Sequence, residues 1–259
     1  MSRKTTKKTY ETSLFFGKDV FSNDIKSLLK MVNEKVIRTK RTVKIFTPNP
    51  EQLVLAQENK KFSKYLDQAD ILIPDGIGMV VFSKLLGKLK KKPSIKERIS
   101  GVDVVQKLLK TASEESWKVL LIGGKDYDKK LHNIYIHGLS KEAKLSLLWS
   151  PGYEKVSSPT KEEKEELESL IKKEKPKLVF VAFGAPWQEK WVIEHEEALN
   201  KNGVELAMVV GGSFDMLFGK LKRAPMWMRA FGLEWLFRLI QEPSRLKRQL
   251  KLVKFIRLS

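Results

Sequence analysis

Three uninterrupted apolar runs, each followed at once by glycine, constrain the fold of this 259-residue chain more than any other feature. They are KVLLIGG at residues 118–124, KLVFVAFG at 177–184 and LAMVVGG at 206–212. A strand with one solvated face alternates apolar and polar residues, whereas a continuous apolar run indicates a parallel strand that helices cover on both faces. The chain is therefore predicted to fold around a mainly parallel sheet.

Further strand-like runs extend this pattern at residues 43–46, 71–73 and 145–149, and helix-like stretches separate the runs. This alternation predicts βα units, and hence an α/β fold with a Rossmann-like core whose mainly parallel sheet is covered by helices. Ahead of the core, SLFFGKDVF predicts a short hairpin around Gly17, and residues 23–36 have the apolar spacing of a helix. Ligands of such sheets bind at the carboxyl edge of the strands, where the glycines lie.

The character of the sequence changes near Phe214, where aromatic and aliphatic residues begin to interleave with arginine and lysine. Between Lys220 and Ser259 there are eleven basic residues and two acidic ones, against a net charge of +19 for the whole chain. We predict a catalytic core at residues 1–215 and a basic amphipathic helical appendage at 216–259, suited to an anionic membrane surface. A pair of terminal helices packed on the core, with snorkelling basic side chains, is the alternative interpretation.

Composition narrows the functional classes. The chain contains no cysteine, so disulfides and thiolate chemistry are excluded, and its three histidines have no metal-ligand spacing. The charged opening MSRKTTKKTYETS has no apolar signal segment, and no run of about eighteen uncharged apolar residues follows, which predicts a cytoplasmic protein that does not span the membrane. The positive charge predicts an anionic partner, and a nucleic-acid-binding protein is the alternative from another class, although no such motif is present.

The stretch FTPNPEQ follows the first strand of the predicted core. Its two prolines hold Thr47 and Asn49 in extended geometry, so this polar loop is stiff. A stiff polar loop at a strand end is suited to a binding site. A plain strand-to-helix turn, with Pro50 as the first helical residue, is the other interpretation.

Asp75 follows the next strand, in ILIPDGIGMV, and is predicted to lie beside the start of a helix. Burial at a strand end would raise the pKa of its carboxyl group from about 4 and make it an effective general base. An Asx turn that caps the following helix is the alternative role for an Asp-Gly pair.

Further polar or glycine-rich clusters occur in the sequence after Asp75. Arg98, just before a helix predicted to begin near Val102, offers a seat for an anion, and a solvated basic loop is the alternative interpretation. Gln188, after the strand near residue 180, can hydrogen-bond a polar ligand, and glycine pairs let a ligand approach the backbone at Gly123, Gly124, Gly211 and Gly212. Together these clusters favour one extended polar site.

A D-x-D pattern at Asp126 and Asp128 is the sequence feature closest to a divalent-metal site. Lysines flank it, and acidic residues are favoured in the first turn of a helix in any case. We therefore predict no metal site.

Taken together, TPNPEQ, PDGIGMV, RISGVD, LLIGG, GAPWQEKW, GGSFD and KRAPMWMRAFGLEWLFRLIQEPSR resemble the WecG/TagA/CpsF family of bacterial glycosyltransferases, over about residues 15–248. The resemblance implies an inverting transfer of a sugar, typically N-acetylmannosamine, from a UDP-sugar to N-acetylglucosamine on a polyprenyl diphosphate. It places the reaction on the inner face of the cell membrane, in teichoic acid or surface polysaccharide synthesis, without a metal cofactor. UDP-glucose or UDP-N-acetylmannosaminuronate are alternative donors, and the oligomeric state is open, a homo-oligomer included.

The resemblance also assigns roles to residues. Asp75 would be the general base on the acceptor hydroxyl, and Thr47 and Asn49 would position the donor sugar or the acceptor. Arg98 and Gln188 would line the same pocket. Three arginines of the appendage would neutralise the diphosphate, because the departure of UDP without a metal requires arginines and helix N-termini: Arg223, Arg238 and Arg245.

Overall fold

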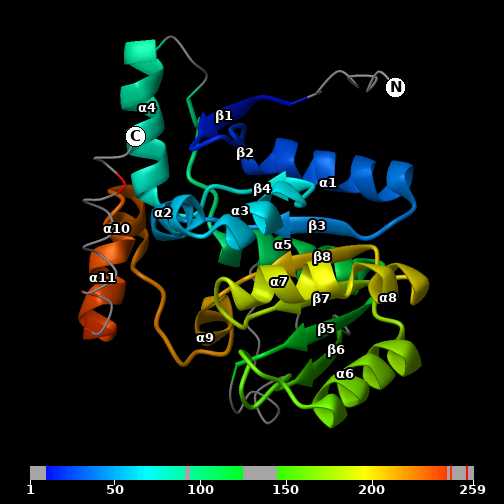
Figure 1. Cartoon of the computed structure of the whole chain (residues 1–259). Coiled ribbons are helices and arrows are strands. Elements are labelled where there is room, and N and C mark those ends of the chain that lie inside the picture. The colour runs from blue at the N-terminus through cyan, green and yellow to red at the C-terminus, as the bar shows by residue number, and fades with distance from the viewer. Residues whose placement is uncertain (1–9, 91–93, 125–144, 244–245, 247–254, 256–259) are drawn as a thin grey trace.

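The computed structural model describes residues 10–90, 94–124, 145–243, 246 and 255, and Figure 1 shows how they are arranged. The described elements are, in chain order, β1 (Thr12–Phe15), β2 (Lys18–Phe21), α1 (Ile25–Thr39), β3 (Val43–Phe46), α2 (Pro50–Glu58), α3 (Lys60–Asp67), β4 (Ile71–Leu72), α4 (Ile77–Lys90), α5 (Gly101–Glu114), β5 (Lys118–Ile122), β6 (Ser146–Ser150), α6 (Lys161–Glu174), β7 (Leu178–Val181), α7 (Trp187–Glu194), α8 (Glu196–Lys201), β8 (Leu206–Val209), α9 (Ser213–Leu217), α10 (Met226–Ala230) and α11 (Glu234–Gln241).

A parallel sheet of six strands forms the centre of the molecule, in the order β4-β3-β8-β7-β5-β6. Every strand-like run of the sequence corresponds to one of these strands, and the runs at 43–46, 71–73 and 145–149 agree with their strands to within one residue at each end. The prediction of a mainly parallel sheet covered by helices is confirmed. The carboxyl ends of β3, β4, β7 and β8 adjoin one another because these four strands are neighbours in the sheet.

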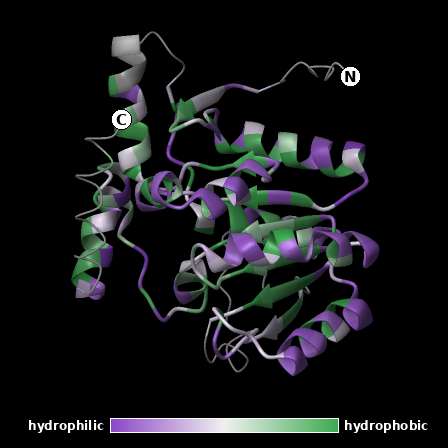
Figure 2. Cartoon of the chain, in the orientation of Figure 1, coloured by the Kyte–Doolittle hydropathy of each residue, from purple (hydrophilic) through white to green (hydrophobic). Residues whose placement is uncertain are grey.

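Helices cover both faces of the sheet, which explains why most residues of the strands are apolar. On one face, α1, α5 and α9 pack against alternate strand residues such as Ile45 and Phe180. On the other face, α2, α3, α4, α6, α7 and α8 pack against the intervening residues, such as Phe46 and Val179. Figure 2 shows the strands in the green of apolar residues, while α6 and α8 carry purple, hydrophilic outer surfaces.

The predicted hairpin is also confirmed. Strands β1 and β2 pair antiparallel, and Phe15 faces Lys18 across the turn. Both turn residues have positive φ, 47° at Phe16 and 77° at Gly17, as a two-residue type I′ turn requires. Outside the sheet, the ring of Phe255 packs 5.3 Å from that of Phe16, so a late segment of the chain contacts the hairpin.

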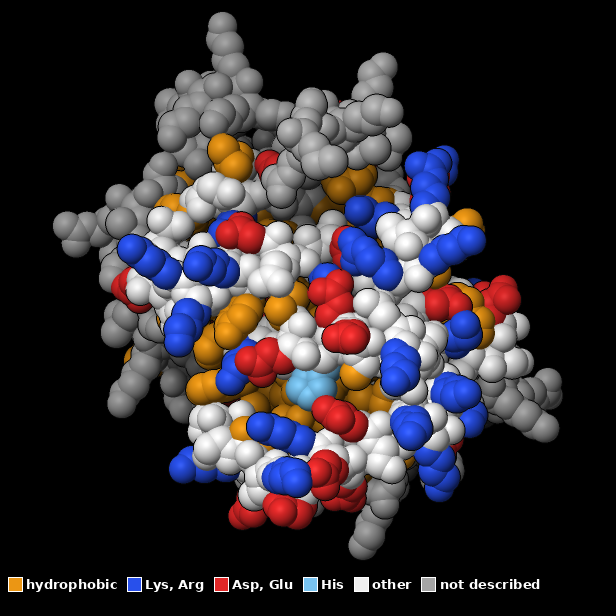
Figure 3. Space-filling view, turned by 45° about the vertical axis from the view of Figure 1, so that its right-hand side comes forward, with side chains coloured by type: hydrophobic (Ala, Val, Ile, Leu, Met, Phe, Trp, Pro, Cys, Tyr) orange, Lys and Arg blue, Asp and Glu red, His pale blue; other side chains and the backbone are white. Residues whose placement is uncertain are grey.

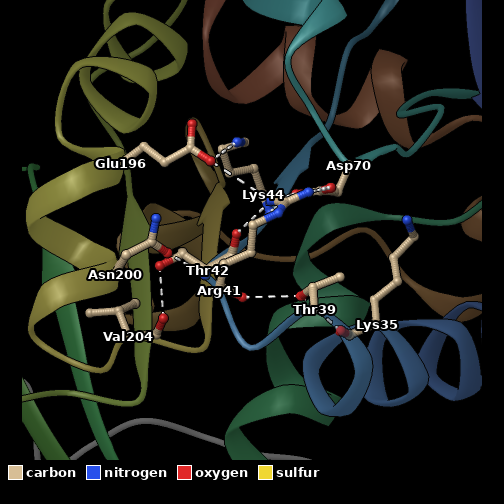
Figure 4. Close-up of polar contacts among 9 residues, drawn as sticks. All are labelled: Lys35, Thr39, Arg41, Thr42, Lys44, Asp70, Glu196, Asn200 and Val204. Carbon is tan, nitrogen blue, oxygen red and sulfur yellow. Dashed lines mark hydrogen bonds and ion pairs between the residues drawn. The ribbon is translucent and has the colours of Figure 1, made fainter. Parts of the chain in front are cut away.

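Charged side chains fasten the amino edge of the sheet, opposite the edge at which ligands bind (Figure 4). Arg41 holds Asp70 through two hydrogen bonds, of 2.9 and 2.5 Å. Asp70 also accepts a bond from the backbone N–H of Lys44, while the buried ammonium of Lys44 pairs with Glu196 of α8. This network stabilises the starts of β3 and β4.

The described part of the C-terminal region consists of α10 and α11, which lie on the α4 side of the molecule (left in Figure 1). A Cβ at Gly232, between the two helices, would come within 2.7 Å of Ile77 of α4, so this junction touches the core. None of the described helices is both long and apolar enough to cross a bilayer. The division at residue 215 stays a prediction.

Candidate active site

A cavity of about 520 Å³ opens at the carboxyl edge of the sheet. Its walls come from the segments that follow β3, β4, β7 and β8, from the start of α5, and from α4 and α11. Parallel strands bring their carboxyl ends to one edge, so residues far apart in sequence meet there. Eight of the residues predicted for the site line this cavity: Thr47, Asn49, Asp75, Arg98, Gln188, Gly211, Gly212 and Arg238.

The proline-rich loop after β3 both caps a helix and forms part of the cavity wall. The Asn49 side chain accepts a bond from the backbone N–H of Gln52, and the Gln52 side chain accepts one from the N–H of Asn49, at 2.9 and 3.0 Å. Pro50 is the first residue of α2, as the alternative interpretation of this loop expected. Thr47 donates its hydroxyl hydrogen to the carbonyl of Val209 at 3.2 Å, which ties the loop to β8.

Asp75 lies at the centre of the site, between the start of α4 and the wall formed by α11. Its backbone N–H donates to the carbonyl of Pro48 at 3.1 Å, so the ends of β3 and β4 are joined beside it. Its side chain reaches the cavity, and burial raises the pKa of the carboxyl group above its usual value. The positive charges of Arg98 and Arg238 act in the opposite direction and lower that pKa. A carboxyl group whose pKa is raised in this way is a stronger base than an ordinary aspartate.

The sequence analysis missed Glu234, which forms a buried ion pair with Arg98 in the wall of the cavity. Glu234 is the first residue of α11, and its side chain is only 5% exposed. The sequence contained one indication of its importance, since Glu234 is one of only two acidic residues between Lys220 and Ser259. Buried carboxylates require partners, and Arg98 provides one.

Gln188 joins two of the strand ends that form the cavity. Its side-chain oxygen accepts hydrogen bonds from the N–H groups of Gly184 and Gly211, both at 3.2 Å, so the loops after β7 and β8 are held together. Its amide nitrogen donates to the buried carboxyl of Glu189 at 3.0 Å. Burial raises the pKa of Glu189 to about 7. Gln188 therefore lines the cavity and also holds in position the backbone of the two loops that form part of its wall.

The structure does not bring Gly123 and Gly124 to this cavity. They follow β5, which lies beyond β7 in the sheet and is therefore farther than β7 from β8, β3 and β4. At Gly123, φ is 96° and a Cβ would lie 3.0 Å from the backbone of Ala182, so close packing between β5 and β7 explains the glycine. The strand order, which no local motif encodes, decides this outcome.

Two further predictions concern the arginines of the C-terminal region. Arg223 does not line the cavity, since its guanidinium pairs with Asp103 of α5 at 2.6 Å. Arg245 lies outside the described residues, as do Asp126 and Asp128 of the D-x-D pattern. Within the described ranges, no group of three or more acidic or histidine side chains is placed to hold a metal ion.

Comparison with known proteins gives one consistent result. The family model described as "Glycosyl transferase WecG/TagA/CpsF family" matches residues 14–259. A relative from Bacillus spizizenii is 29% identical over 247 residues, which cover 92% of this chain and 86% of the relative. A relative from Bacillus subtilis is 31% identical over 236 residues, covering 90% and 85%. Both relatives are named N-acetylglucosaminyldiphosphoundecaprenol N-acetyl-beta-D-mannosaminyltransferase.

Proposed function

Because this chain belongs to the WecG/TagA/CpsF family of glycosyltransferases, we propose that it transfers N-acetylmannosamine from a UDP-sugar to N-acetylglucosamine on a polyprenyl diphosphate. The names of the two Bacillus relatives support this acceptor and this sugar. The observation that carries the proposal is the grouping of Asp75 with Arg98 and Arg238 in one cavity at the carboxyl edge of the sheet. Such a site combines a base with cations for a diphosphate.

The chemistry follows from these groups. Asp75 takes the proton from the acceptor hydroxyl as the oxygen forms a bond to the anomeric carbon of the donor. The bond between that carbon and the diphosphate breaks on the opposite face, so the configuration inverts and UDP leaves with the electron pair. Arg98 and Arg238, together with the backbone N–H groups at the start of α5, stabilise the developing negative charge on the diphosphate.

The walls of the cavity hold the two substrates in position. Thr47 and Asn49 lie on the loop that a capping box makes rigid, and Gln188 fixes the loops after β7 and β8. Gly101, at the start of α5, packs near the side chains of Thr47 and Ser213, at 3.8 and 3.6 Å from the position of a Cβ. These loops are therefore held in position before the donor and the acceptor bind.

The lipid-linked acceptor requires access to a membrane, and the C-terminal helices provide a suitable surface. Four large apolar residues of α10, α11 and the segment between them are mostly exposed: Met226 (77%), Trp227 (60%), Phe231 (75%) and Ile240 (69%). Basic residues neighbour them in the sequence, as in amphipathic segments that bind anionic lipid. Peripheral binding to the inner membrane face is part of the proposal.

A donor screen tests the function. Purified protein is incubated with UDP-N-acetylmannosamine, UDP-glucose or UDP-N-acetylmannosaminuronate and a short-chain lipid diphosphate that carries N-acetylglucosamine, and the release of UDP is followed. We expect release that requires both the acceptor and UDP-N-acetylmannosamine. Turnover with another donor would correct the sugar, while no acceptor-dependent release with any donor would refute the proposal.

A further inference from the structure

The pairing of Arg98 is incomplete in a way that indicates a ligand. Its Nη2 donates to Glu234, and its side chain is 19% exposed. A guanidinium has five N–H donors, and the buried Nε of Arg98 has no hydrogen-bond partner among the described residues. A buried donor without a partner is costly, so the site favours a ligand with more acceptor oxygens than one carboxylate offers.

The charged side chains that line the cavity also determine how an anionic ligand can bind there. The described charged residues that line it are two arginines and three acids: Arg98, Arg238, Glu51, Asp75 and Glu234. Among the described residues that line the cavity, positive charge is therefore not in excess, although the chain as a whole carries +19. A diphosphate that enters this cavity meets Arg98 already paired with the carboxylate of Glu234, and it has to compete for that guanidinium.

We propose that Glu234 is a built-in competitor of the diphosphate: its carboxylate holds Arg98 in the empty site, gives way when UDP binds, and pairs with Arg98 again as UDP leaves. This inference rests on the proposed function and deepens it, because it assigns Glu234 a part in product release. A site built only from cations would bind the product UDP more tightly than turnover allows. Glu234 acts through Arg98 and is a positioning residue.

The position of Glu234 in the fold confines this exchange of partners to the wall of the cavity. Glu234 begins α11, while Arg98 precedes α5, so the pair joins two elements across the cavity. Arg238 lies one helical turn after Glu234 and also acts electrostatically on Asp75. When the carboxylate of Glu234 leaves Arg98, the guanidinium of Arg98 is therefore free to bind the diphosphate at this wall of the cavity.

The test measures the affinity for UDP and for inorganic diphosphate by calorimetry, at low and high salt, in wild-type protein and in Glu234→Gln, Glu234→Asp and Glu174→Gln. Glu234→Gln keeps an acceptor for Arg98 but removes the charge. Glu174→Gln is the matched control, because it makes the same charge change in the pair with Lys118, far from the cavity. Circular dichroism establishes that each variant is folded.

We expect Glu234→Gln to bind both ligands about tenfold more tightly at low salt, since one charge-assisted hydrogen bond no longer competes. Most of the gain should persist at high salt, because salt screens a buried pair much less than exposed charges. Glu234→Asp, whose carboxylate reaches less far, should lie between wild type and Glu234→Gln, and it decides the question alone if Glu234→Gln does not fold. Glu174→Gln should match wild type.

Turnover provides the second readout. With Glu234→Gln we expect a rapid first turnover followed by a slower steady state, and kcat and KM for the donor should fall together because UDP leaves slowly. Unchanged or weaker binding of diphosphate in both Glu234 variants would overturn the inference, as would an equal gain in Glu174→Gln, since the change in net charge alone would then explain it. Diphosphate binding needs no sugar transfer, so this result is independent of whether the proposed donor and acceptor react.

Discussion

Asp75 and Glu189 are two carboxyl groups whose pKa burial raises, and their surroundings separate their roles. Asp75 reaches the cavity and lies within the field of Arg98 and Arg238. Glu189 does not line the cavity and contacts Gln188. We therefore assign the proton transfer to Asp75 and a structural role to Glu189.

Replacement of Asp75 by Asn should remove the base while it leaves the shape of the site intact. We expect the rate of sugar transfer to fall by about a thousandfold or more, since general base catalysis typically contributes 10²–10⁴-fold. Binding of UDP, measured by calorimetry, should change by less than about tenfold. A variant that transfers sugar at the wild-type rate would show that Asp75 is not the base.

The raised pKa of Glu189 predicts how the free energy of unfolding depends on pH. Its pKa in the folded protein, about 7, lies above the ordinary value of 4.5, so the folded state holds the proton more tightly. As pH rises from 4.5 to 7, the unfolded chain loses this proton first and the free energy of unfolding falls, by about 3 kcal/mol in total. Above that range the effect is constant.

Glu189→Gln should remove this dependence, because an amide does not titrate and still accepts the bond from Gln188. Urea unfolding at pH 5 and pH 8 measures it: the loss of stability between the two should be smaller in the variant than in wild type by about 2–3 kcal/mol. Equal losses in the two proteins would mean that Glu189 does not keep its proton in the folded state.

Among the elements, the loop from β3 to α2 combines two functions that substitution can separate. Asn49→Ala removes the capping box and should lower the free energy of unfolding by about 1 kcal/mol. Asn49→Ser keeps a capping oxygen but lacks the amide, so its stability should be near that of wild type. If Asn49→Ser nevertheless raises the KM for donor or acceptor, the amide contacts that substrate; unchanged kinetics would leave Asn49 with the cap alone.

The elements also show how far the sequence alone could lead. Runs such as KVLLIGG identified the strands because burial on both faces leaves a local signature, and turn residues identified the hairpin. The site was harder to predict, since it depends on which strands are neighbours. Gly123 and Gly124 fell outside the cavity for that reason. Glu234 and the partner of Arg223 depend on how α11 and the chain before α10 pack, which no motif records.

Over the part of the molecule that the structure describes, exposed apolar side chains are distributed unevenly. On the face that Figure 3 shows, basic and acidic side chains are interspersed. Exposed apolar residues gather instead on α10, α11 and the neighbouring α4, where Val81 is 61% exposed beside the cavity. This arrangement favours docking of one side of the molecule on a membrane, with the cavity opening near that side.

The joint replacement of Trp227 and Phe231 by Ser should weaken binding to anionic liposomes by about tenfold or more, because each ring removes apolar area from water when it enters the interface. Activity with a short-chain, water-soluble acceptor should stay near the wild-type value. Ile37→Ser is the control, since Ile37 is 67% exposed on α1. Liposome co-sedimentation measures the effect, and equal binding by all three proteins would exclude α10 and the segment after it as the contact.

The position of β8 has a consequence for the order in which the protein can be assembled. It is the last strand of the sheet along the chain, yet it lies between β3 and β7 and hydrogen-bonds to both. Until residues 206–209 have left the ribosome, β3 and β7 lack the strand that pairs with both of them. Each of the two then exposes an unpaired apolar edge. Chains interrupted before this point should therefore aggregate rather than persist as smaller folded units.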